Sequence, residues 1–281
     1  MAANKKGQGG PQLTNAAKPA TFEVEAFNER GEMVPTSIAG EHPLTIYVDK
    51  REIVTIMTLG HAPEALVIGY LRNQRLVKSL EEIRAVQVDW DTESVAVTTT
   101  SGRELELGKR TVTSGCGQGT VFGDLMEEID QVKLRDDVSL TDESLFVLLD
   151  KVRRHETIYK QAGAVHGCAL ADTNGEILMF VEDVGRHNAV DAIAGYMWLD
   201  AIDGSDKVFY TTGRLTSEMV IKCAQMRIPF LVSRSGLTQM GYAIAKKVGL
   251  TMLGRASGKH YLAFTGKERL KRTSNQPTAV A

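Results

Sequence analysis

The sequence predicts an α/β protein: a layered α/β domain in the second half and a smaller β-rich domain before it. Short strands and helices alternate regularly over residues 208–254, a pattern typical of parallel βαβ units. Residues 21–58 instead contain short β-branched segments separated by Gly or Pro turns. With 281 residues the chain exceeds the size at which single cores usually divide, so two domains are expected.

The β-rich domain is expected to span residues 21–112. Strands are predicted in TFEVEAF, LTIYVDK and EIVTIMT, followed by a helix at 63–73. Pro63 suits the first position of this helix, whereas Gly69 is expected to weaken its middle. The segments AVQVDWD and SVAVTTT are then typical of a hairpin.

The remaining boundaries follow from composition. Residues 1–20 are rich in Gly, Ala, Asn and Lys and lack the apolar core of a secretory signal, which predicts a disordered leader. Residues 113–137 are expected to form a mobile loop and linker, and residues 271–281 a loose tail. The α/β domain is predicted to span residues 138–270.

The α/β domain is predicted to begin with an amphipathic helix in SLTDESLFVLLDKVRRH, with Thr141 as its N-cap. GAVHGCALAD and EILMFVED are expected to be neighbouring strands that turn at Asn174–Gly175. A helix capped by Asn188 follows in NAVDAIAGYMWL. In the alternation that follows, strands are predicted in VFYTT, PFLVS and TMLG. The helices between them are predicted in TSEMVIKCAQM and LTQMGYAIAKKV.

Composition excludes several classes of protein. The chain is 43% hydrophobic and 24% charged with a formal net charge of −2, so bulk charge does not indicate a nucleic-acid-binding protein. Three cysteines, an odd number, argue against a disulfide framework and fit a reducing compartment. No apolar run reaches transmembrane length, and the predicted location is the cytoplasm.

Glycine and a basic residue recur where the three strands of the alternation end. In open α/β sheets, ligands bind beyond the carboxyl ends of the strands. Glycine lets backbone N–H groups approach an anion, and the arginine fork matches phosphate oxygens. Three such ends on one sheet edge favour an anion site over the alternative of turn glycines and solvated arginines. The first end carries Gly213 with Arg214 and the second carries Arg234 with Gly236. The third carries Gly254 with Arg255, followed by Gly258 with Lys259.

The segment VEDVGRHNAVD, residues 181–191, is the densest polar cluster, and it lies between a predicted strand and a predicted helix. Such junctions are common places for catalytic or ligand-binding groups. The structural alternative is that Asn188 and Asp191 cap the helix while Arg186 pairs with Glu182. The other polar members are Asp183 and His187.

The three cysteines have different surroundings. Cys116 lies in SGCGQGT among small, flexible residues, whereas Cys168 and Cys223 lie in apolar segments and are expected to be core residues. A loop cysteine can act as a nucleophile or accept sulfur, and its pKa falls near cationic groups. A zinc site of Cys116, His166 and His187 is the competing interpretation. No C-x-x-C pair supports it, so no metal is expected, and His166 is predicted to be a hydrogen-bonded core residue.

Together these motifs resemble the FdhD family of formate dehydrogenase accessory sulfurtransferases, from about Phe22 to Leu270. The most specific segment is EDVGRHNAVDAIAG. The others are GHAPEALVIGYL, SGCGQG, GAVHGCAL, TTGRLTSEMVIKCAQMRIPFLVSRSGLT and GLTMLGRASGKHYLAFT.

The resemblance implies a sulfur carrier that is required for formate dehydrogenase activity. A cysteine desulfurase would pass sulfur to Cys116, and the resulting persulfide would deliver it to the molybdenum cofactor, a bis-molybdopterin guanine dinucleotide for which GDP is an analogue. The family fold resembles that of cytidine deaminases, without their zinc chemistry and with a small added N-terminal domain. The resemblance also implies that the protein forms a homodimer. The cofactor-binding segment corresponds to Arg255, Ala256, Ser257, Gly258, Lys259 and His260. Combined with the strand-end and cluster residues, the expected cofactor site also includes Gly213, Arg214, Arg234, Arg186 and His187.

Two positions depart from the family pattern. Gly119 stands where many members have the second cysteine of a C-x-x-C, so a single-cysteine persulfide is the remaining route. Arg255 stands where relatives often have an aromatic residue. The alternative functions are a cofactor-binding chaperone without sulfur transfer and a cysteine hydrolase using Cys116 and His187.

Overall fold

The computed structural model describes residues 10–102, 129, 132–155 and 157–272. These divide into two compact units. The N-terminal unit contains residues 10–102, 162–164 and 183–202, and the C-terminal unit contains the other described residues. The predicted mixed α/β class is confirmed. The similarity to cytidine deaminases stays a prediction. Among the described residues, no helix is both long and apolar enough to cross a membrane.

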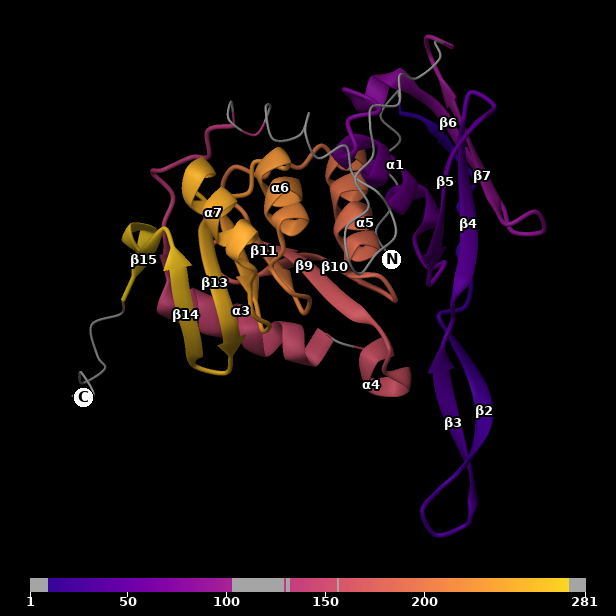
Figure 1. Cartoon of the computed structure of the whole chain (residues 1–281), viewed down its shortest axis with the longest axis horizontal. Coiled ribbons are helices and arrows are strands. Elements are labelled where there is room, and N and C mark those ends of the chain that lie inside the picture. The colour runs from indigo at the N-terminus through magenta and orange to yellow at the C-terminus, as the bar shows by residue number, and fades with distance from the viewer. Residues whose placement is uncertain (1–9, 103–128, 130–131, 156, 273–281) are drawn as a thin grey trace. The chain divides into compact units, whose positions relative to one another are not determined.

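The N-terminal unit is built on a five-stranded sheet with the order β1-β6-β7-β4-β5 (Figure 1). Burial alternates along the strands, and Leu44, Ile46 and Val48 of β4 are fully buried, as expected for a sheet with one face on a core. The predicted hairpin is confirmed, because β6 and β7 pair antiparallel. The strands are β1 (Gln12–Leu13), β4 (His42–Val48), β5 (Arg51–Thr58), β6 (Ile83–Asp89) and β7 (Ser94–Thr99), with a short 3-10 helix η1 (Leu80–Glu82) before β6.

The described part of the predicted leader is ordered against this sheet, contrary to the prediction of disorder. Strand β1 pairs parallel with β6. The backbone N–H of Ala16 donates to the Glu64 carboxylate at 2.8 Å, and the Trp90 indole N–H donates to the Ala16 carbonyl. Lys18 Nζ lies 5.2 Å from the centroid of the Trp90 ring. These tertiary contacts order a segment whose own composition gives no strand signal.

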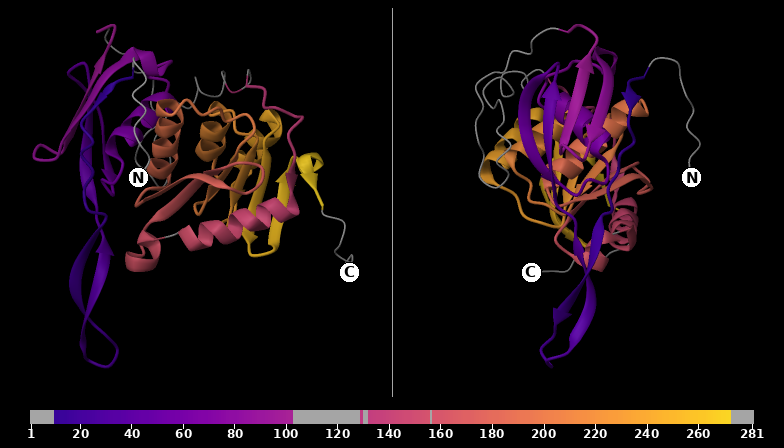
Figure 2. Two further views of the ribbon diagram at one scale, coloured as in Figure 1. Left: turned by 180° about the vertical axis from the view of Figure 1, so that it is seen from behind. Right: turned by 90° about the vertical axis from the view of Figure 1, so that its right-hand side faces the viewer.

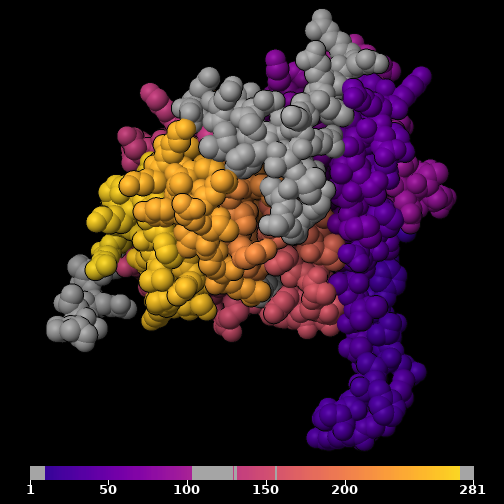
Figure 3. Space-filling view, in the orientation of Figure 1, coloured from indigo at the N-terminus to yellow at the C-terminus, as the bar shows by residue number. Residues whose placement is uncertain are grey.

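Strands β2 (Thr21–Phe27) and β3 (Met33–Ala39) form a two-stranded antiparallel ribbon in register from Thr21↔Ala39 to Phe27↔Met33. The ribbon projects from the five-stranded sheet of its own unit (Figures 1 and 2). In the space-filling view it is the narrow indigo projection (Figure 3). None of its residues is buried. Strand β3 was not predicted, because Pro35 interrupts its pattern.

Helices α1 (Pro63–Asn73) and α5 (Arg186–Leu199) pack closely within the N-terminal unit. A Cβ atom on Gly69 would lie 1.7 Å from the Asp191 carbonyl oxygen, and one on Gly195 would lie 1.9 Å from the Ala65 carbonyl oxygen. The helix at 63–73 is confirmed. Gly69, which was expected only to weaken that helix, is required for the close approach of the two backbones. The Arg72 guanidinium also donates to the Ala194 carbonyl at 2.8 Å.

The prediction that Asn188 caps α5 is wrong: the helix begins two residues earlier, with Gly185 as N-cap. The Asn188 amide donates instead to the Asp183 carboxylate at 2.7 Å and to the Met57 carbonyl at 2.7 Å. The same carboxylate accepts from Thr58 Oγ1 at 2.6 Å and from two backbone N–H groups. Burial raises the pKa of Asp183, and these hydrogen bonds oppose that shift. This part of the polar cluster therefore fastens the start of α5 to the end of β5.

The C-terminal unit contains a six-stranded sheet with the order β10-β9-β11-β12-β13-β14 (Figure 1). The predicted parallel βαβ units are confirmed, because β11, β12 and β13 pair in parallel. The predicted turn between β9 and β10 is also confirmed, with the Gly175 N–H donating to the Asp172 carbonyl. The strands are β9 (His166–Ala171), β10 (Ile177–Asp183), β11 (Val208–Thr211), β12 (Phe230–Ser233), β13 (Thr251–Ser257) and β14 (His260–Thr265).

Helices cover both faces of this sheet (Figures 1 and 2). Helix α3 (Asp142–His155) packs its leucines on a core that includes Tyr210 and Phe230. Thr141 Oγ1 accepts from the Ser144 N–H at 3.1 Å, which confirms the predicted cap. Helices α6 (Ser217–Gln225) and α7 (Gln239–Val248) pack side by side on the other face, and the short helix α4 (Ile158–Ala162) follows α3.

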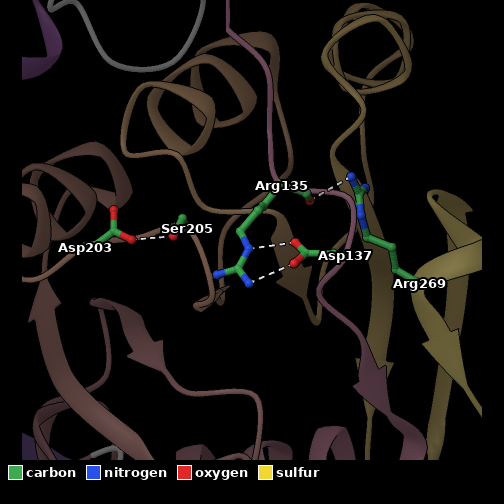
Figure 4. A network of polar contacts seen from close by, with 5 residues as sticks. All are labelled: Arg135, Asp137, Asp203, Ser205 and Arg269. Atoms are coloured by element: carbon green, nitrogen blue, oxygen red, sulfur yellow. Dashed lines mark hydrogen bonds and ion pairs between the residues drawn. The ribbon is translucent and has the colours of Figure 1, made fainter.

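Buried Arg269, at the end of the 3-10 helix η2 (Lys267–Arg269), joins three parts of the C-terminal unit (Figure 4). Its guanidinium donates to the carbonyls of Gly249 and Arg135. The Arg135 side chain forks onto Asp137 with N···O distances of 2.6 and 2.9 Å. Next to it in sequence, β15 (Leu270–Lys271) pairs with β8 (Leu140–Thr141). The nearby Asp203 carboxylate accepts from Ser205 Oγ.

Candidate functional site

The candidate site lies in the C-terminal unit, where the parallel strands β11 and β12 end. Thr211 and Ser233, the last residues of the two strands, are partners in the register. Ser233 Oγ donates to the Gly213 carbonyl at 2.6 Å. The Leu215 N–H donates to the Gly236 carbonyl at 3.0 Å. The loops carrying Arg214 and Arg234 are therefore tied to each other, as the parallel arrangement predicts.

The helices that follow these two loops begin differently. Both loops end in Leu-Thr, and Leu215 and Leu237 form a parallel bridge. At the start of α7, Thr238 Oγ1 accepts from the Gly241 N–H at 3.2 Å. At the start of α6, the N-cap Thr216 makes no such bond, and its buried hydroxyl has no hydrogen-bond partner among the described residues. The first N–H groups of α6 are thus not satisfied by their N-cap side chain.

The third predicted strand end is placed differently from the expectation. Strand β13 does not end at Gly254 but continues to Ser257, and Gly258 lies in the turn to β14. Arg255 sits at an irregularity of the β13–β14 register with a positive φ of 53°. Its backbone N–H donates to the Ser235 carbonyl at 2.9 Å, which fixes Arg255 beside the β12 loop. Bulges of this kind often re-aim a side chain next to a functional site.

The other members of the predicted segment 255–260 have unequal access to a ligand. Ala256 is 1% exposed and belongs to the core under α3, so its side chain is not available. Ser257, Lys259 and His260 are exposed. Only part of this segment can therefore contact a bound molecule through side chains.

His166 lies beside the β11 loop and is half-buried. Its Nδ1 is 3.2 Å from Thr212 Oγ1, and the same hydroxyl accepts from the Gly167 N–H at 3.1 Å. The predicted hydrogen bond of His166 is therefore present, although the ring is less buried than a core residue. Thr212 was not singled out from the sequence, since nothing in its spacing distinguishes it from other strand residues.

Tyr159 and Glu182 complete the arrangement, and sequence reasoning missed this role for both. The guanidinium of Arg234 lies 5.1 Å from the centroid of the Tyr159 ring. The Glu182 carboxylate accepts backbone N–H groups of Ile158 and Tyr159, each at 3.0 Å. Glu182 is thus engaged by the start of α4, rather than paired with Arg186 as the structural alternative expected.

Arg186 and His187 belong to the N-terminal unit, whereas the strand-end loops belong to the C-terminal unit. Both side chains lie in the first turn of α5 and are buried, at 8% and 2% exposed. Arg186 Nε has no hydrogen-bond partner among the described residues. A place for these two residues in a cofactor site remains a prediction from the sequence.

Cys116 lies outside the described residues, as does Gly119. Cys168 and Cys223 are both fully buried and free of disulfides, as predicted. Cys168 Sγ donates to Thr211 Oγ1 at 3.3 Å. Burial raises the pKa of the Cys223 thiol well above its ordinary value. Neither thiol is suited to form a reactive thiolate in the folded protein.

We expect brief alkylation of the native protein to modify Cys116 and to spare Cys168 and Cys223. A buried thiol must wait for local opening, so both should react roughly 100-fold or more slowly than in urea. Peptide mapping by mass spectrometry before and after denaturation measures the difference. Labelling of Cys168 or Cys223 as fast as Cys116 in the native protein would contradict the assignment.

Within the described ranges, no three His, Cys, Asp or Glu side chains are grouped as a metal site. The zinc alternative involves Cys116, which lies outside those ranges, and His166 and His187, which belong to different units.

The chain matches the model of the FdhD/NarQ family over residues 39–271. This match covers most of the sequence, including both units. The chain belongs to the FdhD/NarQ family. The resemblance drawn from the EDVGRHN, TGR and SGCGQG segments is confirmed.

Relatives of this FdhD/NarQ protein match over nearly their whole lengths. A sulfur carrier protein FdhD of Listeria monocytogenes is 31% identical over 263 residues, which are 92% of this chain and 99% of the relative. The one of Bacillus subtilis is 27% identical, covering 86% of this chain and 94% of the relative. A crystal structure from Desulfotalea psychrophila, described as a candidate formate dehydrogenase accessory protein, is similar with a TM-score of 0.73 and 27% identity. The match covers 90% of this chain and 100% of the Desulfotalea chain.

Proposed function

We propose that this protein is a sulfur carrier for formate dehydrogenase and that Cys116 carries the sulfur. The names of its relatives support the general role. The observation that carries the assignment to one residue is the complete burial of the other two cysteines. A sulfur carrier must present its thiolate to two partners in turn, and a side chain with no exposed surface cannot do so without unfolding its surroundings.

The proposed transfer begins on a cysteine desulfurase. The Cys116 thiolate attacks the terminal sulfur of the desulfurase persulfide, a new S–S bond forms on Cys116, and the desulfurase thiolate leaves. No electrons are gained or lost overall. Because Gly119 occupies the position of a second loop cysteine, no neighbouring thiol at that position can attack the Cys116 persulfide and release sulfide. The Cys116 persulfide would then give its outer sulfur atom to the molybdenum cofactor, which is the substrate of this step, and the Cys116 thiolate would be released. The two electrons that reduce this sulfur to sulfide would come from a thiol reductant.

We place the cofactor phosphates at the ends of β11 and β12. The tied loops present exposed Arg214 and Arg234, and Arg255 is fixed beside them by its hydrogen bond to Ser235. The N-terminus of α6, where Thr216 leaves the backbone N–H groups without a side-chain cap, adds partial positive charge. This combination suits the phosphates of a guanine dinucleotide, with the base supplied by the family resemblance.

The direct test of sulfur transfer is incubation with a desulfurase and cysteine, followed by a persulfide-trapping reagent and peptide mapping. The expected product is one additional sulfur atom on the Cys116 peptide. The Cys116→Ser variant is the control and should gain none. Absence of added sulfur on the unaltered chain, or its presence on the Cys168 or Cys223 peptide, would overturn the assignment.

GDP is expected to bind the full chain more tightly than ADP, and Arg214→Ala is expected to weaken GDP binding. The loss of charge-assisted hydrogen bonds to phosphate should reduce affinity roughly 10- to 100-fold. Isothermal titration calorimetry measures the affinities for GDP and ADP and the effect of Arg214→Ala on GDP binding. Lys246→Ala removes the same charge from an exposed position near the other end of α7 and should leave the affinity unchanged. Equal binding of ADP, or equal losses in both variants, would count against a guanine site here.

A further inference from the structure

The carboxylate of Glu182 is buried, 4% exposed, and accepts four hydrogen bonds from one short segment. Its Oε2 accepts from the Thr157 N–H at 3.2 Å, the Thr157 hydroxyl at 3.1 Å and the Ile158 N–H at 3.0 Å. Its Oε1 accepts from the Tyr159 N–H at 3.0 Å. A buried carboxylate is costly unless it is hydrogen-bonded in this way. These bonds join β10 to a segment 23 to 25 residues earlier in the chain.

Helix α4 depends on this carboxylate for its position. It spans only Ile158–Ala162, and so short a helix is not stable by itself in water. None of its residues is buried, so packing contributes little to its placement. The Glu182 carboxylate satisfies the N–H groups that begin it and favours them electrostatically. Glu182 therefore fixes the place of Tyr159, the second residue of the helix.

Tyr159 in turn restricts Arg234. The guanidinium lies 5.1 Å from the ring centroid, a cation–π contact, and Arg234 comes directly after β12. A guanidinium that stacks through its face keeps its N–H donors at its edge, where they can form the bidentate bonds that phosphate accepts. An arginine side chain loses rotamer freedom when it binds a ligand, and contacts that order it beforehand reduce that loss.

We infer that Glu182 and Tyr159 are positioning residues: Glu182 places Tyr159 through α4, and Tyr159 holds Arg234 ready for the phosphate groups of a nucleotide ligand. This inference rests on the proposed cofactor site and names two residues that the proposal does not use. Glu182 is expected to act only through Arg234. A carboxylate with a purely structural role would instead affect stability whether or not Arg234 is present.

The experiment combines a binding measurement with a direct report on Arg234 in the full chain. Calorimetry gives the GDP affinity of Glu182→Gln, Tyr159→Leu and Tyr159→Phe. Arginine side-chain NMR resonances, assigned with Arg234→Ala, give the ring-current shift that Tyr159 imposes on Arg234. Glu143→Gln, an exposed carboxylate on α3, is the matched control. Circular dichroism at the measuring temperature establishes that each variant is folded.

We expect Glu182→Gln and Tyr159→Leu each to weaken GDP binding roughly 2- to 30-fold, the range of a cation–π contact, and to abolish the ring-current shift of Arg234. Tyr159→Phe keeps the aromatic ring and should therefore keep both the GDP affinity and the ring-current shift of Arg234. When Arg234 is already alanine, adding either variant should change the GDP affinity less than about 2-fold, because its effect passes through Arg234.

The outcomes separate this inference from the proposed function. An unchanged Arg234 shift in Glu182→Gln, or an equal loss of affinity with and without Arg234, would overturn the positioning role while leaving the GDP site in place. If the unaltered chain bound no GDP but Glu182→Gln still moved the Arg234 resonances, the positioning would stand and the nucleotide site would fail.

Discussion

Cys116→Ser is expected to abolish formate dehydrogenase activation by this protein. Serine is close to cysteine in size, but its oxygen cannot form the persulfide that the proposed transfer requires. Cells lacking their own accessory protein, complemented with each variant at matched expression, provide the assay. Formate-dependent dye reduction should fall to the level of uncomplemented cells, a loss of at least about 100-fold if no other group substitutes for the sulfur nucleophile.

The controls separate chemistry from folding and from cofactor binding. Cys168→Ala and Cys223→Ala remove buried thiols, so they should lower stability by about 1 kcal/mol and leave activation intact in the folded fraction. Cys116→Ser should bind GDP like the unaltered chain, since the proposed phosphate site is at the strand ends. Full activation by Cys116→Ser would refute the carrier mechanism and favour a cofactor chaperone that transfers no sulfur.

The parallel core of the C-terminal unit was predictable because its signals are local. Each strand of the 208–254 alternation is a short apolar run, each helix has its own amphipathic period, and parallel pairing places the strand ends on one edge. The tied loops of Gly213 and Arg234 follow from that rule. Strand β13 ran past its predicted end because it pairs with β14 through an irregular register that residue pattern does not reveal.

The errors arise where distant segments decide local structure. Residues 12–13 form a strand only because they pair with β6. The Asn188 side chain donates hydrogen bonds to Asp183 and Met57 and does not cap the helix. The contribution of Tyr159 and Glu182 was hidden for the same reason. Glu182 was recognised as part of a polar cluster, but its partners are Thr157 and the first residues of a five-residue helix that has no periodic pattern of its own.

Gly69→Ala is expected to destabilise the N-terminal unit strongly, against the direction of helix propensity. In an exposed helix interior, replacing Gly with Ala stabilises by about 1 kcal/mol. Here the added methyl group would lie 1.7 Å from the Asp191 carbonyl oxygen, which is backbone and cannot rotate away. Helices α1 and α5 would have to separate, and we expect a loss of about 3 kcal/mol or more, at the upper end of overpacking effects. Urea unfolding monitored by circular dichroism measures the change.

Gly195→Ala tests the same contact from the other helix, since its methyl group would lie 1.9 Å from the Ala65 carbonyl oxygen. Gly10→Ala is the control: no atom lies within 4 Å of its added Cβ, and no loss of stability is expected. Separation of the helices by one substitution relieves the clash made by the other, so the double variant should lose clearly less than the sum of the two single losses. Additive losses would mean that the two glycines act independently. Stabilisation by Gly69→Ala would mean that helix propensity, not the close approach of α1 and α5, decides this position.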